Sequence, residues 1–193
     1  MWAKVESGSV TEIYTRPKPI TIGDVQYPKN IFELWSEAEL KAIGIYIVEI
    51  DNTNLKDKEY YYNTNQTFNF ASDKVTASYG SATAKSLIDT TETEGGVTTT
   101  LLGLKNIRKN DINSDAAALL EKHDWMSIRE AEGGTAMPSN IKIWRGNVRG
   151  KANDMCNLID GVSDVDALKA LYVYDIEEDP PVRPLGEFPV EPS

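Results

Sequence analysis

The clearest periodicity in the chain lies between residues 139 and 160, where apolar side chains recur every three or four residues. This spacing places them on one face of an α-helix, so we expect a long helix whose apolar stripe packs on a core. The stripe consists of Ile141, Trp144, Val148, Ala152, Met155 and Ile159. Upstream, Asp124 is expected to cap a short helical turn that ends at Gly133-Gly134, and Ser139 to cap the long helix.

Helical spacing also marks the residues on either side of this stripe. Leucines and isoleucines predict helix over residues 101–120, either as one bent helix or as two short helices that meet near Ser114. Ser163 and Asp166 are expected to cap a last short helix over residues 165–171. Together these segments predict a small helical bundle.

Alternation of apolar and polar positions, which is typical of β-strands, dominates the first 80 residues. We expect short strands, most of them in hairpins, over residues 2–14, 20–27, 45–50 and 60–79. The run 45–50 is apolar except for Glu49, which predicts a strand buried on both faces. Ser36 and Glu39 have capping-box spacing and predict one short helix among the strands. One face of the later strands is expected to carry Tyr60, Tyr62, Phe68, Phe70, Val75 and Ala77, either as cross-strand packing or as a sugar-binding face.

These patterns predict an α+β chain with four parts. An antiparallel β-rich domain with one short helix is expected over residues 1–89, and a linker rich in Thr, Gly and Glu over residues 90–100. A small helical bundle follows over residues 101–174. The acidic end, residues 175–193, contains five prolines and is expected to be an extended arm that becomes ordered only against a partner. Its removal should therefore spare folding.

Charge and composition exclude several classes of function. The net charge is −10, and the last 38 residues carry nine acidic but only two basic side chains, which argues against sequence-independent binding of nucleic acid. No apolar run is long enough to span a membrane, and polar residues near the N-terminus argue against a signal peptide. Cys156 is the single cysteine, so no intrachain disulfide is expected, in keeping with synthesis in a reducing cytoplasm.

Candidate chemistry is sparse. His123-Asp124 invites a general-base interpretation, but a local pair supplies neither a nucleophile nor an orienting group, so helix capping explains it better. No Cys/His cluster has metal-ligand spacing and no glycine-rich phosphate loop follows a strand, so we expect no cofactor and no enzyme activity. Lys142, Arg145 and Arg149 share a helix face, which is either solvated, in contact with the acidic arm, or placed against phosphates.

Two glycines interrupt the long helix. Gly146 and Gly150 are four residues apart, and each costs about 1 kcal/mol relative to alanine in an exposed helix. Either the helix simply tolerates them, or they permit close approach of another helix, from this bundle or from a neighbouring subunit.

Two groups of residues resemble proteins of bacteriophage tails. The first comprises Tyr27-Pro28-Lys29-Asn30-Ile31-Phe32, Trp35-Ser36-Glu37-Ala38-Glu39 and Ala42-Ile43-Gly44-Ile45-Tyr46. It resembles the N-terminal segment of small tail and tail-fibre-associated proteins of tailed phages. The second comprises Asp124-Trp125, Ile128-Arg129, Met137-Pro138, Trp144-Arg145 and Val148-Arg149. It resembles the C-terminal helical motif of proteins similar to tail-fibre-assembly chaperones.

The resemblance implies a non-enzymatic structural component of a tailed-phage virion, at the fibre or baseplate attachment of the tail, made in the host cytoplasm. The alternatives are an assembly chaperone absent from the mature particle and, third, an enzyme acting on cell-wall sugar. The expected partners are other tail or fibre proteins in a homo- or hetero-oligomer, with no nucleic acid and no membrane. The residues expected at partner interfaces are Gly146, Gly150, Arg145, Arg149, Pro180, Pro181, Pro184, Leu185 and Phe188.

Overall fold

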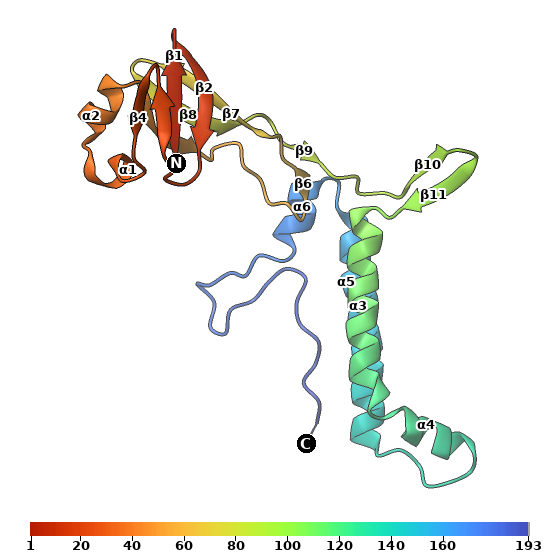
Figure 1. The fold of residues 1–193 in the computed structure, drawn as a ribbon. Helices are drawn as coiled ribbons and strands as arrows, with labels where there is room; N and C mark the ends of the chain where they lie inside the picture. The colour runs from red at the N-terminus through yellow and green to blue at the C-terminus, as the bar shows by residue number, and fades with distance from the viewer. Residues whose placement is uncertain (193) are drawn as a thin grey trace. The chain divides into compact units, whose positions relative to one another are not determined.

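The computed structural model describes residues 1–192, which form two compact units that divide between Thr83 and Ala84 (Figure 1). The first unit is built mainly from strands, and the second from helices and one hairpin. The α+β class predicted from the sequence is therefore confirmed. The division falls at residue 83, a few residues before the expected linker.

A curled sheet of five strands forms the first unit, in the order β2-β1-β5-β8-β7. Its strands are β1 (Trp2–Glu6), β2 (Ser9–Tyr14), β5 (Ile45–Asp51), β7 (Gln66–Ala71) and β8 (Lys74–Tyr79). All neighbours are antiparallel except β5 and β8, which run parallel. The expectation of a purely antiparallel domain is wrong for this pair, because the chain reverses once to form β7 and again to form β8.

The two faces of this sheet carry separate hydrophobic cores. Ala3, Val48 and Val75 belong to one core, against which Phe68 and Phe70 pack as expected. The other core lies under α1 (Ile31–Leu34), α2 (Glu37–Ala42) and the hairpin of β3 (Ile20–Ile22) and β4 (Val25–Tyr27). It contains Tyr14, Ile20, Ile31, Phe32, Leu40 and Ile45. The capping box of α2 is confirmed: the Ser36 N–H donates to the Glu39 carboxylate at 2.7 Å, and the Ser36 hydroxyl accepts from the Glu39 N–H.

Two details of the strand predictions are wrong. Ile47 and Ile50 are 46% and 58% exposed, so β5 is not buried on both faces along its length. β1 pairs with β5 only from Ile45 to Ile47, so Ile50 has no β1 residue beside it. Tyr62 is 64% exposed, because its strand β6 (Tyr61–Tyr62) pairs with β9 (Thr83–Ala84) outside the five-stranded sheet.

The second unit contains four helices: α3 (Leu104–Glu121), α4 (Asp124–Ala131), α5 (Ser139–Gly161) and α6 (Val165–Ala170). α3 is a single helix rather than two, and it packs against α5. The predicted apolar stripe of α5 is buried along its whole length, from Ile141 to Ile159, which confirms the helical periodicity.

The helix ends differ from the expected caps. α5 begins after Pro138 without a side-chain cap, so Ser139 is its first helical residue rather than its cap. α6 is capped by Asp164, whose Oδ1 accepts from the Ala167 N–H at 2.8 Å, rather than by Ser163 or Asp166. Asp124 starts α4 but does not cap it, because its carboxylate is engaged by an arginine of α5.

Candidate interaction site

A β-hairpin occupies the stretch that was expected to be a linker. β10 (Thr90–Glu94) and β11 (Val97–Leu101) pair antiparallel across Gly95-Gly96. Both glycines have positive φ, which matches a two-residue type I′ turn that suits the natural twist of paired strands. The linker interpretation is therefore wrong: a polar composition hid two strand-length runs separated by a Gly-Gly turn.

All ten strand residues of this hairpin are exposed. Figure 1 shows no other element of the second unit against either of its faces. The register places four threonines on one face, with Thr93 Oγ1 and Thr98 Oγ1 hydrogen-bonded at 3.0 Å. The opposite face carries Glu92 and Glu94 together with Val97 and Leu101, which are 67% and 45% exposed. A two-stranded hairpin with no packed face is only marginally stable in water.

The base of the hairpin is fastened to the start of α3. The Leu104 N–H donates to the Ser86 carbonyl at 2.9 Å, and the Lys105 N–H donates to the Leu87 carbonyl at 3.1 Å. These bonds satisfy two of the amides that a helix start leaves without partners. Asp89 accepts from the Gly103 N–H and from the Asn106 side chain, both at 2.8 Å. The hairpin is thus held at its base while its faces stay open.

Gly103 permits this close crossing. A Cβ at this position would overlap the backbone of Ile88, which cannot move away as a flexible side chain would. We expect Gly103→Ala to destabilise the helical unit by about 1–3 kcal/mol, as overpacking generally does. Urea denaturation followed by far-UV circular dichroism measures this. An unchanged urea midpoint would show that Gly103 does not lie against the backbone of Ile88.

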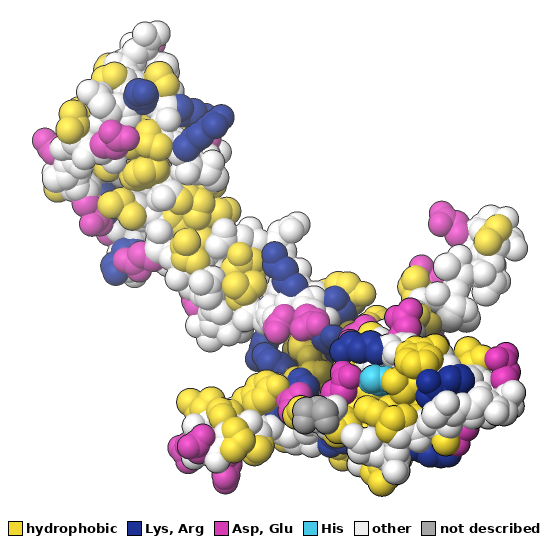
Figure 2. All heavy atoms as spheres, turned by 90° about the horizontal axis from the view of Figure 1, so that it is seen from below, with side chains coloured by type: hydrophobic (Ala, Val, Ile, Leu, Met, Phe, Trp, Pro, Cys, Tyr) yellow, Lys and Arg dark blue, Asp and Glu magenta, His cyan; other side chains and the backbone are white. Residues whose placement is uncertain are grey.

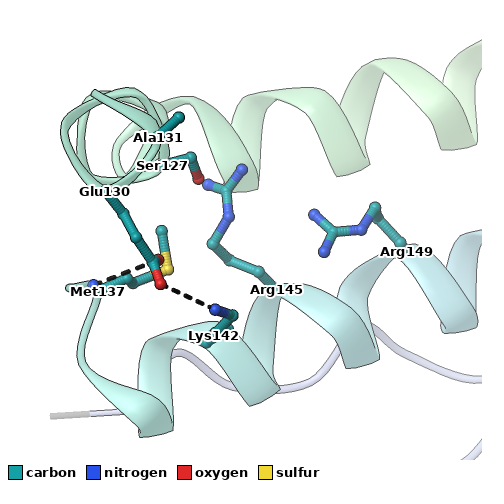
Figure 3. A pocket seen from close by; sticks show the side chains of 7 residues that line it. All are labelled: Ser127, Glu130, Ala131, Met137, Lys142, Arg145 and Arg149. Carbon is teal, nitrogen blue, oxygen red and sulfur yellow. Dashed lines mark hydrogen bonds and ion pairs between the residues drawn. The ribbon is translucent and has the colours of Figure 1, made fainter. Parts of the chain in front are cut away.

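A small basic cavity lies between α4 and α5 (Figure 3). Its volume is about 310 Å³, and it is lined by Ser127, Glu130, Ala131, Met137, Lys142, Arg145 and Arg149. Glu130 accepts from Lys142 at 3.0 Å and from the Met137 N–H at 3.4 Å. The hydrogen bond from Lys142, followed by that from Met137, lowers the pKa of the Glu130 carboxyl below its ordinary value.

The two arginines of this cavity have different surroundings. Arg145 is only 7% exposed; its guanidinium donates to Asp124 Oδ1 at 2.6 Å and to the Leu120 carbonyl at 2.5 Å. It therefore ties α5 to the end of α3 and the start of α4, which is a structural role. Arg149 is exposed at the cavity wall and makes no ion pair within residues 1–192. Its charge is available to an anionic group.

The C-terminal segment packs on its own helices. Leu185 is 2% exposed, and its N–H donates to the Leu171 carbonyl at 3.0 Å. Trp144 Nε1 donates to the Pro189 carbonyl at 3.0 Å. Glu191 pairs with Lys122 at 3.0 Å and with His123 Nε2 at 2.8 Å. The expectation that this arm is ordered only against a partner is wrong, because its anchor points lie within the same unit.

The remaining interface candidates in the arm differ in burial. Pro180, Pro181 and Pro184 are exposed, whereas Phe188 is half-buried. Only Leu185 among these candidates is part of the core. As partner contacts, the three prolines and Phe188 stay predictions.

Glu191 makes the attachment of the arm dependent on pH. Its hydrogen bonds with Lys122 and then with His123 hold the pKa of the carboxyl below its ordinary value of 4.5. Its contribution to stability is therefore fully present above pH 4.5 and is lost as the pH falls through the lowered pKa. We expect the difference in urea midpoint between wild type and Glu191→Gln to be present at pH 7 and to vanish in acid. A difference that persists below the lowered pKa would contradict this.

His123 helps to hold the C-terminal arm through its pairing with Glu191. Its ring packs edge-on against Trp144, with centroids 5.6 Å apart, and its Nδ1 has no hydrogen-bond partner within residues 1–192. Figure 2 shows the single histidine, in cyan, between acidic and hydrophobic side chains. His123 forms a hydrogen bond with Glu191, rather than acting as a pair with its neighbour Asp124 as considered from the sequence.

Gly146 and Gly150 lie on an open face of α5. An added Cβ at either position would meet no atom within 4 Å, so no helix described in the second unit approaches them closely. The close-approach interpretation is therefore wrong for this bundle, and contact with a neighbouring subunit stays a prediction. We expect Gly146→Ala to stabilise the isolated protein by about 0.5–1 kcal/mol through helix propensity. A loss of stability in thermal unfolding would indicate that this face is packed.

Other chemistry is limited in the part of the chain that the structure describes. Cys156 is half-buried, and burial raises the pKa of its thiol. Residues 1–192 contain no group of three or more His, Cys, Asp or Glu side chains placed to hold a metal ion. None of the helices described there is long and apolar enough to cross a lipid bilayer. Comparison of the chain with protein-family models, with curated proteins and with solved structures found no match.

Proposed function

We propose that this chain is a non-enzymatic structural component of a tailed-phage virion, located at the fibre or baseplate attachment of the tail. It acts through protein–protein interfaces rather than through chemistry. The tail location comes from the resemblance of the segments around Trp35 and Trp144 to tail proteins. The interface role comes from the geometry of the helical unit.

The observation that carries the interface role is the exposed hairpin of β10 and β11. Its base is fastened to α3 by backbone hydrogen bonds, yet all ten strand residues are exposed. A hairpin of this kind gains stability only when a further strand or surface covers it. A subunit that adds strands to its neighbours uses such an element, because the exposed backbone groups pair with a further strand.

Further exposed apolar side chains support the same role. Trp125 and Ile128 are 53% and 58% exposed on α4, which buries no residue, and Ile143 is 65% exposed on α5. Arg149 adds a cation at the nearby cavity wall. Aromatic and arginine side chains are the residue types enriched at protein–protein interfaces.

Mass spectrometry of gradient-purified phage particles tests the proposal. We expect this chain in the particles, in fixed ratio to a tail protein, and retained after a high-salt wash that removes adventitious proteins. The matched sample is the lysate of infected cells. Absence from particles, together with a complex between this chain and fibre protein in the lysate, would replace the structural role with that of an assembly chaperone.

A further inference from the structure

The hairpin has one free edge suited to a partner strand. The type I′ turn at Gly95-Gly96 makes Glu94 and Val97 the closing hydrogen-bonded pair. Hydrogen-bonding direction alternates along a strand, so Val97, Thr99 and Leu101 direct their backbone groups towards β10. The N–H and C=O groups of Thr98 and Thr100 therefore point outward. The sheet has only these two strands, so this edge is unpaired within residues 1–192.

We propose that β11 pairs with β11 of a second copy of this chain, antiparallel and about a two-fold axis at Thr99. This inference rests on the proposed assembly role for its biological setting and names the partner of the hairpin. The backbone N–H and C=O of Thr98 then form two hydrogen bonds with those of Thr100 in the second copy. Thr100 does the same with Thr98 of the second copy, which gives four hydrogen bonds. The result is a continuous four-stranded sheet, and such a contact uses the same surface on both copies.

The charges of the two strands favour this edge over the other. The same construction on β10 places Glu92 against Glu92 of the second copy, and like charges directly opposite one another are destabilising. β11 has the sequence VTTTL and contains no charged residue and no proline. Exposed edges usually carry such residues to prevent pairing with other chains. Their absence from β11 indicates an edge that is meant to pair.

The exposed apolar side chains of β11 fit the same register. Pairing about Thr99 places Val97 next to Leu101 of the second copy, and Leu101 next to its Val97. These pairs do not exchange hydrogen bonds, so their side chains lie in the closer of the two antiparallel arrangements. Val97 and Leu101 are 67% and 45% exposed in the single chain, and the pairing covers both. The opposite face of the sheet then consists of threonines only.

Cysteine cross-linking in the full chain tests this register. In the Cys156→Ser background, Thr99→Cys should form a disulfide-linked dimer under mild oxidation, because facing Cα atoms are about 4.5 Å apart. Neither Thr98→Cys alone nor Thr100→Cys alone should cross-link, because Thr98 faces Thr100 of the second copy and not its Thr98. An equimolar mixture of these two variants should cross-link. Equal cross-linking of all three single variants would overturn the register.

Sedimentation of proteins without added cysteine gives an independent readout. We expect wild type to form a dimer and Thr99→Glu to lose it, because this variant reproduces the charge clash of β10. Thr91→Glu is the matched control: it adds the same charge to the hairpin away from the β11 edge, so the dimer should remain. Circular dichroism verifies that each variant is folded.

The two proposals fail in different ways. A chain that is monomeric in sedimentation, with Thr99→Cys no more reactive than Thr91→Cys, contradicts β11 pairing even if the chain is found in phage particles. A dimer that is lost with Thr99→Glu supports the pairing even if the chain is absent from particles. In that case only the virion role would be wrong.

Discussion

Trp144→Ala should lower the free energy of unfolding of the helical unit by about 3–5 kcal/mol, the usual range for truncating a buried tryptophan. Trp144 is 4% exposed and lies in the apolar stripe of α5. Its indole also donates to the Pro189 carbonyl at 3.0 Å and supports the ring of His123. The substitution therefore opens a cavity and leaves a carbonyl of the C-terminal arm without its donor. Urea denaturation followed by far-UV circular dichroism measures the change.

The chain offers a matched control for this substitution. Trp125 is the same residue type in the neighbouring helix α4, but it is 53% exposed, and the guanidinium of Arg129 lies over its ring, 4.8 Å from the centroid. Trp125→Ala should cost about 1 kcal/mol or less. A near-neutral effect of Trp144→Ala, or equal effects of both variants, would place Trp144 outside the core.

Leu185→Ala should destabilise the helical unit by about 2–5 kcal/mol, although it lies in a proline-rich end piece. The side chain is 2% exposed, and the backbone N–H of the same residue is bonded to Leu171. Deletion of residues 176–193 should destabilise further, because it also removes the acceptor of Trp144 and the carboxylate of Glu191. Thermal unfolding of the variants alongside the full chain measures both effects.

Val190→Ala is the matched control within the same segment. Val190 is 91% exposed, and exposed substitutions of this kind usually change stability by about 0.5 kcal/mol or less. If Leu185→Ala is as mild as Val190→Ala, and the truncated chain is as stable as the full one, then the arm is only loosely attached. The sequence-based expectation that its removal spares folding would then be restored.

Local patterns in the sequence predicted the local structure well. The stripe of α5 is buried as its periodicity indicates, and the Ser36–Glu39 capping box forms as its spacing indicates. Both depend on residues three or four positions apart, whose relation the chain itself fixes once a helix begins. The first two hairpins were predicted because each joins two strands by a short turn, so the paired residues are close in the sequence.

Features that depend on distant residues were not predicted. The parallel pairing of β5 with β8 joins residues 27 positions apart, such as Val48 and Val75, and no local pattern encodes it. Leu185 is buried because it packs on the helical unit and bonds to Leu171, which lies 14 residues earlier in the chain. The composition of the arm does not show this contact, so the arm was predicted to be exposed. Arg145 was expected at an interface with a partner and instead joins three helices of its own unit.

The hairpin of β10 and β11 was missed for a different reason. Its Gly-Gly turn and two five-residue runs were present in the sequence. However, no apolar face distinguishes the strands, since threonines and glutamates occupy most positions. Sequence patterns detect elements by the face that they bury, and this element buries none. An element invisible to such patterns is therefore a place to look for contacts made outside the chain.

The length of α3 sets a fixed spacing within the helical unit. Its 18 residues correspond to about 27 Å at 1.5 Å per residue. The hairpin leaves its first turn, while Lys122 and His123, just beyond its last turn, hold the C-terminal arm. α3 thus fixes the distance between the base of the hairpin and the attachment of the C-terminal arm. Lengthening α3 by whole turns would move the hairpin away from the attachment of the arm in steps of about 5.4 Å.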